Sequence, residues 1–505
     1  MAAPPGYLWI ARREKAESML VCKPAKLVRL FYLVRRRAGC WVMLASMLAG
    51  LCFGRSTVTA DATKNAVQAS TKGFDTTRRI ALTTSKVIGS PDPPPPYRVK
   101  RVYPNLKLNF PIAVRHQPGS DRLWFITQGA PYGRTDICRT RDDQTTSEFE
   151  TLLKLDGTAY DIVFHPKFAE NGYIYLGWNG PAEGKDKKTR ITRYTVDRTP
   201  PYRLDPKSEK LIIEWLSDGH NGGAATFGLD DMFYVTSGDG TSDSDTNIAG
   251  QDMTKLLSKV LRIDVDHPDE GKTYSIPKDN PFYGKEGIRW ETWAYGFRNP
   301  WRITVDAKTG HVWVGQNGQD LWEQAYLVRK GENYGWSVFE GSHPFYPSRR
   351  LGPTPHVLPT VEHPHSEFRS LTGGIVYYGA KSPELQGAYL YGDYSTGKIW
   401  AIRHDGTKTL WHKELADTRL QITGFGVDSR GEILICDHRG QDKGGFYALE
   451  PTPKDLPPST FPARQWSVSL REGSRHGTGN DPLFCKLPVV VGRRAQGAMD
   501  WIAGT

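Results

Sequence analysis

Short stretches in which apolar residues alternate with small or polar ones recur between residues 121 and 436, each directly after a turn that contains Gly or Asp. Such alternation predicts a β-strand, because successive strand side chains point to opposite faces. The stretches follow one another at roughly 45 to 80 residues, the spacing expected when each marks one four-stranded blade and its loops. They begin at Asp121, Asn171, Asp231, Gly310, Gly387 and Gly431.

Six such units predict an all-β chain folded as a six-bladed β-propeller. A single blade cannot cover both of its faces, whereas stacking around an axis buries both and leaves only short strand edges exposed. A β-sandwich with insertions is the competing architecture, because its strands alternate in the same way. Helical periodicity is nearly absent, and we expect at most one short helix, over residues 252–260.

Composition divides the chain into four parts. Residues 1–60 form an expected export leader, and residues 61–96 form an expected polar linker that ends in four prolines. The repeating strand pattern predicts the propeller over residues 97–450. Residues 451–505 lack that pattern and begin with several prolines, so we expect an irregular C-terminal tail there.

The leader shows the order of features found in export signals. Three arginines at 35–37 precede an apolar run over residues 38–53, and residues 58–60 (Val-Thr-Ala) offer a small-residue cleavage site. The run is short for a membrane span, so we expect no stable span in a mature, periplasmic or extracellular chain. An uncleaved anchor is the alternative, and a start at Met19 would shorten the unusual leader.

Charge and cysteine content argue against several classes of protein. The formal net charge is +11, but residues 1–60 hold ten Lys or Arg against two Glu, so only about +3 belongs to the rest and nucleic-acid binding is not indicated. Three of the six cysteines lie in the leader, which leaves Cys138, Cys436 and Cys485. This odd number argues against a disulfide-built scaffold, and the absence of CxxC spacing argues against such a zinc site or attached c-type haem.

A histidine in a glycine-rich loop is the first candidate for chemistry. His220 lies in the run Asp-Gly-His-Asn-Gly-Gly, just before a predicted strand. Glycine lets a loop turn tightly and lets a ligand approach the backbone, and a histidine can act as a base because its ordinary pKa lies near neutrality. For a single histidine, the alternative is that it holds the turn by hydrogen bonds.

Three carboxylates follow the next predicted strand. Asp239, Asp243 and Asp245 lie in a turn rich in Gly and Ser. Carboxylate oxygens are hard ligands of the kind that Ca²⁺ prefers, so the turn is a candidate metal site. It is not an EF-hand, since the Glu expected at the twelfth position is missing, and a solvated acidic turn is the alternative.

An arginine between aromatic residues is the third candidate. Arg298 lies in residues 293–302, Trp-Ala-Tyr-Gly-Phe-Arg-Asn-Pro-Trp-Arg, which is hard to explain as an ordinary turn. A fixed guanidinium can stabilise negative charge that develops during a reaction. Stacking on Trp301 while pairing with a structural acid is the alternative.

These residues belong to an ordered series of segments, from about residue 100 to 450, that resembles the glucose/sorbosone dehydrogenase family. The series includes His220-Asn-Gly-Gly, Tyr-Gly-Phe-Arg298-Asn-Pro-Trp and Gly-Gln316-Asn-Gly-Gln. Several segments are individually weak, and the specific signal is their common order and coverage. The full series is 161–173, 220–223, 259–264, 276–282, 295–301, 315–319, 333–336, 372–374 and 392–400.

The resemblance implies an exported quinoprotein that oxidises an aldose or related sugar with pyrroloquinoline quinone and Ca²⁺, and that passes electrons to a separate acceptor. His220 would take the proton from the anomeric hydroxyl of the sugar while hydride passes to the quinone. Arg298 would face the quinone oxygen that becomes anionic, with Asn299 and Gln316 near the cofactor. A base, a fixed cation and a Lewis acid would together stabilise the charge that develops.

The remaining ligands are less regular. By resemblance, the backbone carbonyls of Asn317 and Gly318 would bind Ca²⁺, and the acidic turn offers further oxygen atoms. The soluble glucose dehydrogenases of the family use a Lys and two later Arg against the quinone carboxylates. Lys398 is the candidate for that lysine, although it lies three residues beyond the expected position, and the stretch 421–425 contains neither arginine.

Two other functions fit the same fold. The family includes animal ectodomains related to the hedgehog-interacting protein, so a secreted binding propeller without redox turnover is the alternative. A calcium-dependent lactone or ester hydrolase on a similar ring is a third possibility, although no Ser nucleophile motif supports a serine mechanism.

The propeller reading makes two geometric predictions. Loops at one end of the ring should bring His220 and Arg298 into one pocket, with roughly 4 to 9 Å between imidazole and guanidinium, and Gln316 should open onto the same pocket. Cys138 and Cys436 should lie near each other, because a ring juxtaposes its first and last blades and export permits oxidation.

Overall fold

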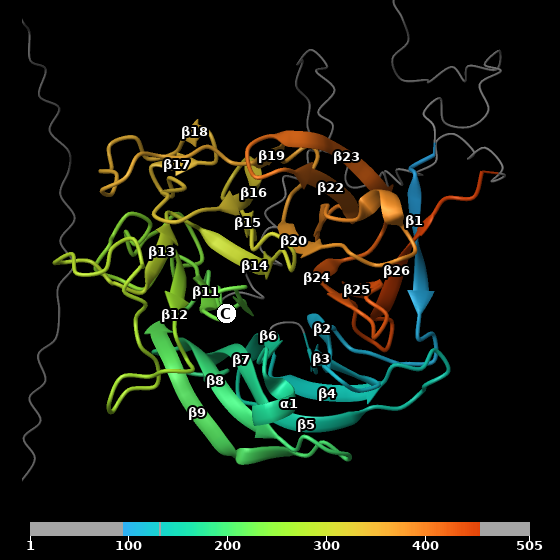
Figure 1. Ribbon diagram of the computed structural model, residues 1–505. Helices are drawn as coiled ribbons and strands as arrows, with labels where there is room; N and C mark the ends of the chain where they lie inside the picture. The colour runs from blue at the N-terminus through green and yellow to red at the C-terminus, as the bar shows by residue number, and fades with distance from the viewer. Residues whose placement is uncertain (1–93, 131–132, 455–505) are drawn as a thin grey trace, which may run out of the picture. The chain divides into compact units, whose positions relative to one another are not determined.

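Six antiparallel four-stranded sheets make up most of the structure (Figure 1). The computed structural model describes residues 94–130 and 133–454. We number the sheets as blades 1 to 6 in chain order. Blade 1 is β2 (Ala113–His116), β3 (Arg122–Gln128), β4 (Thr135–Arg141) and β5 (Glu150–Leu155); blade 2 is β6 (Thr158–Phe164), β7 (Tyr173–Gly180), β8 (Lys188–Val196) and β9 (Leu204–Leu216). Blade 3 is β10 (Ala225–Phe227), β11 (Phe233–Ser237), β12 (Lys259–Ile263) and β13 (Thr292–Tyr295).

The second half of the chain repeats this arrangement. Blade 4 is β14 (Asn299–Val305), β15 (Val312–Asn317), β16 (Trp322–Val328) and β19 (Val361–Pro364); blade 5 is β20 (Leu371–Val376), β21 (Tyr389–Asp393), β22 (Lys398–His404) and β23 (Thr409–Asp417). Blade 6 is β24 (Ile422–Val427), β25 (Ile433–Asp437), β26 (Gly445–Pro451) and β1 (Tyr97–Val102). The small hairpin β17 (Phe339–Glu340) and β18 (His343–Pro344), the helix α1 (Phe168–Asn171) and the 3-10 turn η1 (Pro383–Leu385) complete the described elements.

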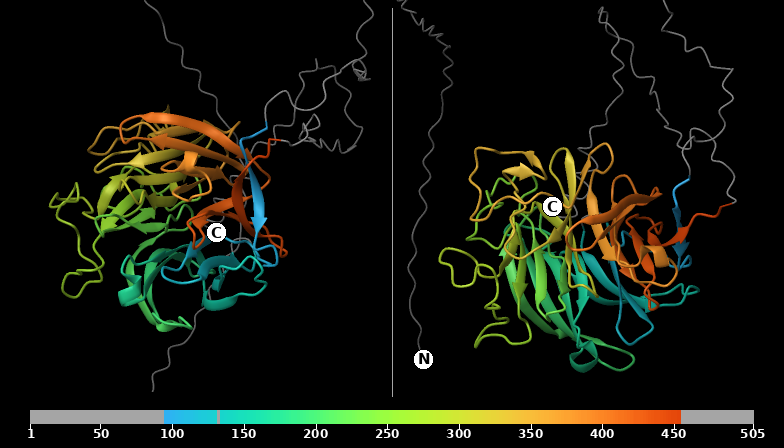
Figure 2. Two further views of the ribbon diagram at one scale, coloured as in Figure 1. Left: turned by 45° about the vertical axis from the view of Figure 1, so that its right-hand side comes forward. Right: turned by 45° about the horizontal axis from the view of Figure 1, so that its top comes forward.

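The first described strand completes the last blade. β1 pairs antiparallel with β26, with Tyr97 opposite Pro451 and Val102 opposite Phe446. Figure 2 shows blue β1 against the red strands at the end of the described chain. Because one sheet contains both chain ends of the described region, the ring is closed by backbone hydrogen bonds.

Apolar clusters lie between each pair of neighbouring blades. On β3, Trp124 and Ile126 pack toward blade 2, whereas Phe125 packs toward blade 6. On β21, Leu390 packs toward blade 6, and Tyr389 and Tyr391 pack toward blade 4. Alternate residues of one strand therefore fill opposite interfaces, which is why a period of two is compatible with burial on both faces.

The first strand of each blade is also the inner strand. β2, β6, β10, β14, β20 and β24 contact one another in a closed cycle around the axis (Figure 1). The loops that precede these strands, together with the loops after the second strands, gather at one end of the ring. His220 and Arg298 precede β10 and β14, and Asp239 and Asn317 lie at the ends of β11 and β15, so all four lie at this end.

The six-bladed propeller is confirmed, and the six alternating stretches are the second strands of the blades, β3, β7, β11, β15, β21 and β25. The short helix expected over 252–260 is wrong. Asp252 accepts hydrogen bonds from the backbone and hydroxyl of Thr254 in a turn, Ser258 has a left-handed φ of 61°, and Lys259 begins β12. The local hydrogen bonds of the aspartate compete with helix formation.

The two cysteines of the described region lie in one interface between blades. Cys138 and Cys436 both lie in the apolar cluster between blades 1 and 6, but each is a free, buried thiol. The two cysteines thus share one cluster, as predicted, and no disulfide joins them in this structure. Cys138 instead lies 3.7 Å from the hydroxyls of Thr127 and Thr151.

No helix within residues 94–130 and 133–454 is long and apolar enough to cross a membrane. The expected leader, nearly all of the expected linker and tail, and Cys485 lie outside the described residues. The described strands extend from Tyr97 to Pro451, and the propeller was expected over residues 97–450.

Candidate active site

A buried histidine–aspartate pair lies at the end of the ring where the inner strands begin. Nδ1 of His220 lies 2.8 Å from Oδ1 of Asp239, and both side chains are fully buried. The loops that carry them are joined through the backbone, because His220 N–H donates to the carbonyl of Thr241 and Gly240 N–H donates to the carbonyl of His220. Since a carboxylate only accepts hydrogen bonds, Nδ1 carries the proton and Nε2 is the basic nitrogen.

Asp239 is held by more than the histidine. Its Oδ1 accepts from the backbone N–H and the hydroxyl of Thr241, both at 3.0 Å. Its Oδ2 accepts from the indole N–H of Trp336 at 2.8 Å. These donors fix the carboxylate, and the carboxylate in turn fixes the orientation of the imidazole.

Arg298 is joined to the same aspartate through the main chain. The backbone N–H of Asp239 donates to the carbonyl of Arg298 at 2.8 Å. Between the two loops lies Gly238, where an added Cβ would lie 2.2 Å from the carbonyl oxygen of His220 and 2.9 Å from that of Arg298. Only glycine allows this close approach of the His220 and Arg298 backbones.

The guanidinium of Arg298 is fixed by its neighbours. Its Nε donates to Oε1 of Gln319 at 2.8 Å, and Nη1 donates to the carbonyl of Asn317 at 3.3 Å. Its central carbon lies 5.9 Å from the centre of the Trp336 ring. Trp336 therefore contacts both the arginine and the aspartate that holds His220.

The predicted cofactor contacts Asn299 and Gln316 join this group. Gln316 accepts from the backbone N–H of Arg298 at 2.9 Å and donates to Gln324. The amide N–H of Asn299 donates to Oδ1 of Asn317 at 3.0 Å. Within the described part of the chain, the buried Oδ1 of Asn299 has no hydrogen-bond partner.

Asn317 and Gly318, the predicted carbonyl ligands, lie where β15 ends. The side chain of Asn317 donates to Ser370 and to the carbonyl of Leu371, and Gly318 N–H donates to Oε2 of Glu323 at 3.2 Å. The turn is therefore anchored to blade 5 and to a buried acid.

The carboxylates of the acidic turn are held by different partners. Asp243 accepts from Nε2 of Gln319 at 2.8 Å, whereas Asp245 accepts from the backbone N–H groups of Ala249 and Gly250. Among the residues that the structure describes, no three His, Cys, Asp or Glu side chains are placed to hold a metal ion. The three aspartates thus have separate hydrogen-bond partners.

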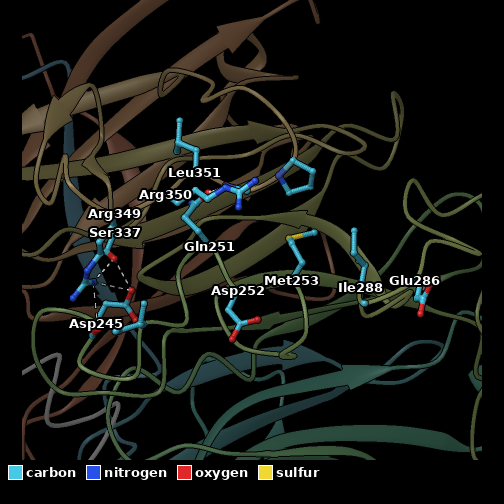
Figure 3. A pocket seen from close by; sticks show the side chains of 14 residues that line it. Asp245, Gln251, Asp252, Met253, Glu286, Ile288, Ser337, Arg349, Arg350 and Leu351 are labelled. Atoms are coloured by element: carbon cyan, nitrogen blue, oxygen red, sulfur yellow. Dashed lines mark hydrogen bonds and ion pairs between the residues drawn. The ribbon is translucent and has the colours of Figure 1, made fainter.

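Asp245 lies in the wall of a separate cavity of about 950 Å³ (Figure 3). Its Oδ2 accepts from the hydroxyl of Ser337 at 2.5 Å and pairs with Arg349 at 3.2 Å. Burial and the nearby Asp239 raise the pKa of Asp245. Met253, Ile288 and Glu286 lie on the other side of this cavity, away from the Asp245 cluster.

Lys398 does not join the group around His220. It begins β22, the third strand of blade 5, and its Nζ lies 2.6 Å from Oε2 of Glu414 on the outermost strand. This ion pair across β22 and β23 holds the Lys398 side chain against blade 5.

Trp336 and Gln319 are the contacts that inspection of the sequence did not single out. Both lie in segments of the ordered series, 333–336 and 315–319, so their motifs were visible. Their roles were not, because Trp336 lies 97 residues from Asp239 and Gln319 lies 21 residues from Arg298.

Comparison with known proteins supports one family. The "HIPL1 protein" of Arabidopsis thaliana is 30% identical over 360 residues, which cover 57% of this chain and 51% of the relative. The "Hedgehog-interacting protein" of Mus musculus is 28% identical over 298 residues, which cover 54% and 40%. The chain thus spans about half the length, or less, of these curated relatives.

A solved structure shares the fold. The PQQ-bound form of an aldose sugar dehydrogenase from Streptomyces coelicolor matches with a TM-score of 0.53 and 22% identity, over 71% of this chain and 99% of that one. Residues 108–443 match the family model described as "Glucose / Sorbosone dehydrogenase". The chain therefore belongs to the glucose/sorbosone dehydrogenase family.

Proposed function

We propose that this chain is an oxidoreductase that oxidises an aldose or related sugar with bound pyrroloquinoline quinone. The observation that carries the proposal is the contact of 2.8 Å between His220 and Asp239, beside the buried Arg298. The proposal includes export to the periplasm or the outside of the cell, on the basis of the leader, and a separate electron acceptor.

In this proposal His220 is the general base. Asp239 holds the Nδ1–H tautomer, so Nε2 is the atom that takes a proton from the sugar hydroxyl. The carboxylate then stabilises the imidazolium that forms. Removing the hydroxyl proton leaves electron density on the sugar oxygen, which promotes loss of hydride from the adjacent carbon. When bound, the quinone supplies the acceptor for that hydride.

The donor set supports a quinone near Arg298. The guanidinium is a preorganised cation, because Gln319, Asn317 and Trp336 hold it, and such a cation stabilises an oxygen that gains negative charge. The unpartnered Oδ1 of Asn299 is a buried acceptor that a polar ligand would satisfy. Arg298, Asn299 and Gln316 would hold the group, and Ca²⁺ would rely on carbonyls at Asn317 and Gly318 rather than on Asp243 and Asp245, which accept hydrogen bonds from other groups.

Reconstitution tests the proposal. The full chain, expressed with export and purified without cofactor, would be titrated with pyrroloquinoline quinone at several Ca²⁺ concentrations and then mixed with aldoses and a redox dye. We expect stoichiometric quinone binding, a change in quinone absorbance on adding sugar, and dye reduction. Absence of stoichiometric binding at every Ca²⁺ concentration would overturn it.

A binding propeller without redox turnover is the second candidate. It is favoured by the ion pair between Lys398 and Glu414 and by Thr423 on the inner strand of blade 6, since neither side chain offers a free cation for quinone carboxylates. Two of the relatives described above are not named as dehydrogenases. Failure of quinone binding together with a cooperatively folded chain is the result that this candidate predicts.

A further inference from the structure

A second cavity, of about 340 Å³, lies on the ring axis at the end opposite His220 and Arg298. All six inner strands contribute to it: five do so with residues from their middle or later part, and the three-residue β10 does so with Ala225 and Thr226. The lining residues are Arg115, His116, Ile162, Val163, Phe164, Ala225, Thr226, Arg302, Ile303, Thr304, Gly374, Ile375, Val376, Phe425, Gly426 and Val427. Since the candidate active site lies where these strands begin, the two sites are separate.

Arg302 of β14 crosses the axis at this cavity. Its Nη1 donates to the carbonyl of Tyr160 at 2.7 Å, its Nη2 to that of Ile112 at 2.9 Å, and its Nε to that of Thr423 at 3.2 Å. One side chain thus ties blade 4 to blades 1, 2 and 6. Every one of these partners is a neutral carbonyl, so none of them neutralises the guanidinium charge.

Arg115 supplies a second cation to the same cavity. Its Nη2 lies 2.6 Å from Oδ1 of Asp161, and its Nη1 donates to the carbonyls of Val114 and Phe425. Asp161 is fully buried, whereas the side chain of Arg115 remains 24% exposed. Two guanidinium groups therefore share one carboxylate around the cavity.

The pKa of Arg302 is consistent with this excess of positive over negative charge. Burial, together with Arg115, lowers the pKa of Arg302 to about 10, and Asp161 offsets only part of that effect. Taking a cation out of water is costly unless an opposite charge compensates it. The cavity has room for about ten water volumes, enough for a small anion and its remaining hydration.

We propose that this axial cavity binds a small oxyanion, a carboxylate or a phosphate, through Arg115 and the uncompensated charge of Arg302. The partly exposed guanidinium of Arg115 is the direct contact, since such a group binds oxyanions through its charge and its N–H donors. This inference does not depend on sugar oxidation or on quinone.

Replacing each member of the Arg115–Asp161 pair by a neutral residue tests the proposal, because the two variants should change the affinity for phosphate in opposite directions. Binding of inorganic phosphate to the full chain, without quinone or sugar, would be measured by calorimetry at constant ionic strength, with acetate and sulfate as further probes. We expect Arg115→Gln to weaken phosphate binding by about tenfold or more, and Asp161→Asn to tighten it several-fold. Arg190→Gln, on the body of blade 2 beside Glu214, is the matched control and should bind as the unaltered chain does.

Comparing acetate with phosphate distinguishes the two classes of anion, because the probe that binds more tightly shows whether the site prefers a carboxylate or a phosphate group. If Arg115→Gln does not fold, Asp161→Asn decides the matter. Unchanged phosphate affinity in a folded Arg115→Gln, or weaker binding in Asp161→Asn, would overturn the proposal, as would the absence of saturable binding of any probe.

Discussion

The Oδ1 atom of Asp239 lies 2.8 Å from Nδ1 of His220, although His220 lies in the connection between blades 2 and 3 and Asp239 in the loop between β11 and β12. The same carboxylate accepts from Trp336, whose ring lies over Arg298. One aspartate thus couples the orientation of the candidate base to the loop that follows blade 4's third strand, and the predictions below test this coupling.

Replacing either of the two central side chains should separate binding from turnover. His220→Ala should reduce the turnover of sugar by about a hundredfold or more and leave quinone binding largely intact, because it removes the base. Arg298→Ala should weaken quinone binding and also lower the rate, because its charge is used in both states. Quinone titration beside dye-linked rates checks both; equal binding loss in the two variants would contradict the assignment.

Asp239→Asn should lower kcat by at least about a hundredfold, because a neutral amide no longer stabilises the imidazolium that forms and its NH2 group would face the indole N–H of Trp336. The pH profile of kcat should shift as well, which a merely structural effect would not cause. Asp143→Asn, an exposed aspartate that caps Thr145, is the control and should leave kcat unchanged. A kcat for Asp239→Asn near that of the unaltered chain would refute the role of the pair.

Trp336→Phe should lower the free energy of unfolding by about 1–3 kcal/mol, because Oδ2 of buried Asp239 loses its indole donor while the ring over Arg298 is kept. Urea unfolding measures this change. Trp290→Phe is the matched control: its indole also donates, to the carbonyl of Lys285, but at an exposed position, so we expect a change within about 0.5 kcal/mol. An equal decrease in the free energy of unfolding of the two variants would show that the hydrogen bond to Asp239 stabilises the fold no more than an exposed one does.

Acid should destabilise the ring through His438. Burial lowers the pKa of His438 to about 3, so below its unfolded pKa of about 6.5 the unfolded chain binds the proton first. Its contribution to stability is present above that pH and is lost as the pH falls toward 3, with a slope approaching about 1.4 kcal/mol per pH unit. Urea midpoints of the chain and of His438→Gln, compared between pH 7 and pH 4, should converge on acidification; a constant difference between the two over this range would contradict the prediction.

Local sequence pattern determined the architecture. The second strands of the blades, such as β3 and β21, are short, bounded by turns and buried on both faces, so their alternation and spacing were visible without any tertiary information. The segment 252–260 misled because its composition allowed a helix, whereas Asp252 hydrogen-bonds its own turn. The order of short motifs was sufficient to place the chain in its family, because these motifs and their order can be read directly along the sequence.

The relations among side chains were decided by tertiary structure. The sequence marked His220, Asp239 and Arg298 as candidates, but their contacts arise because the ring gathers loops from different blades at one end, and Trp336 reaches Asp239 from 97 residues away. Asp243, Asp245 and Lys398 looked equally suitable in sequence, yet the folded chain gives each its own partner: Gln319 for Asp243, Ser337 for Asp245, and Glu414 across β22–β23 for Lys398. Sequence determined which residue types were available and how the blades repeat; closure of the ring determined which of them meet, because these contacts join residues that are distant along the chain.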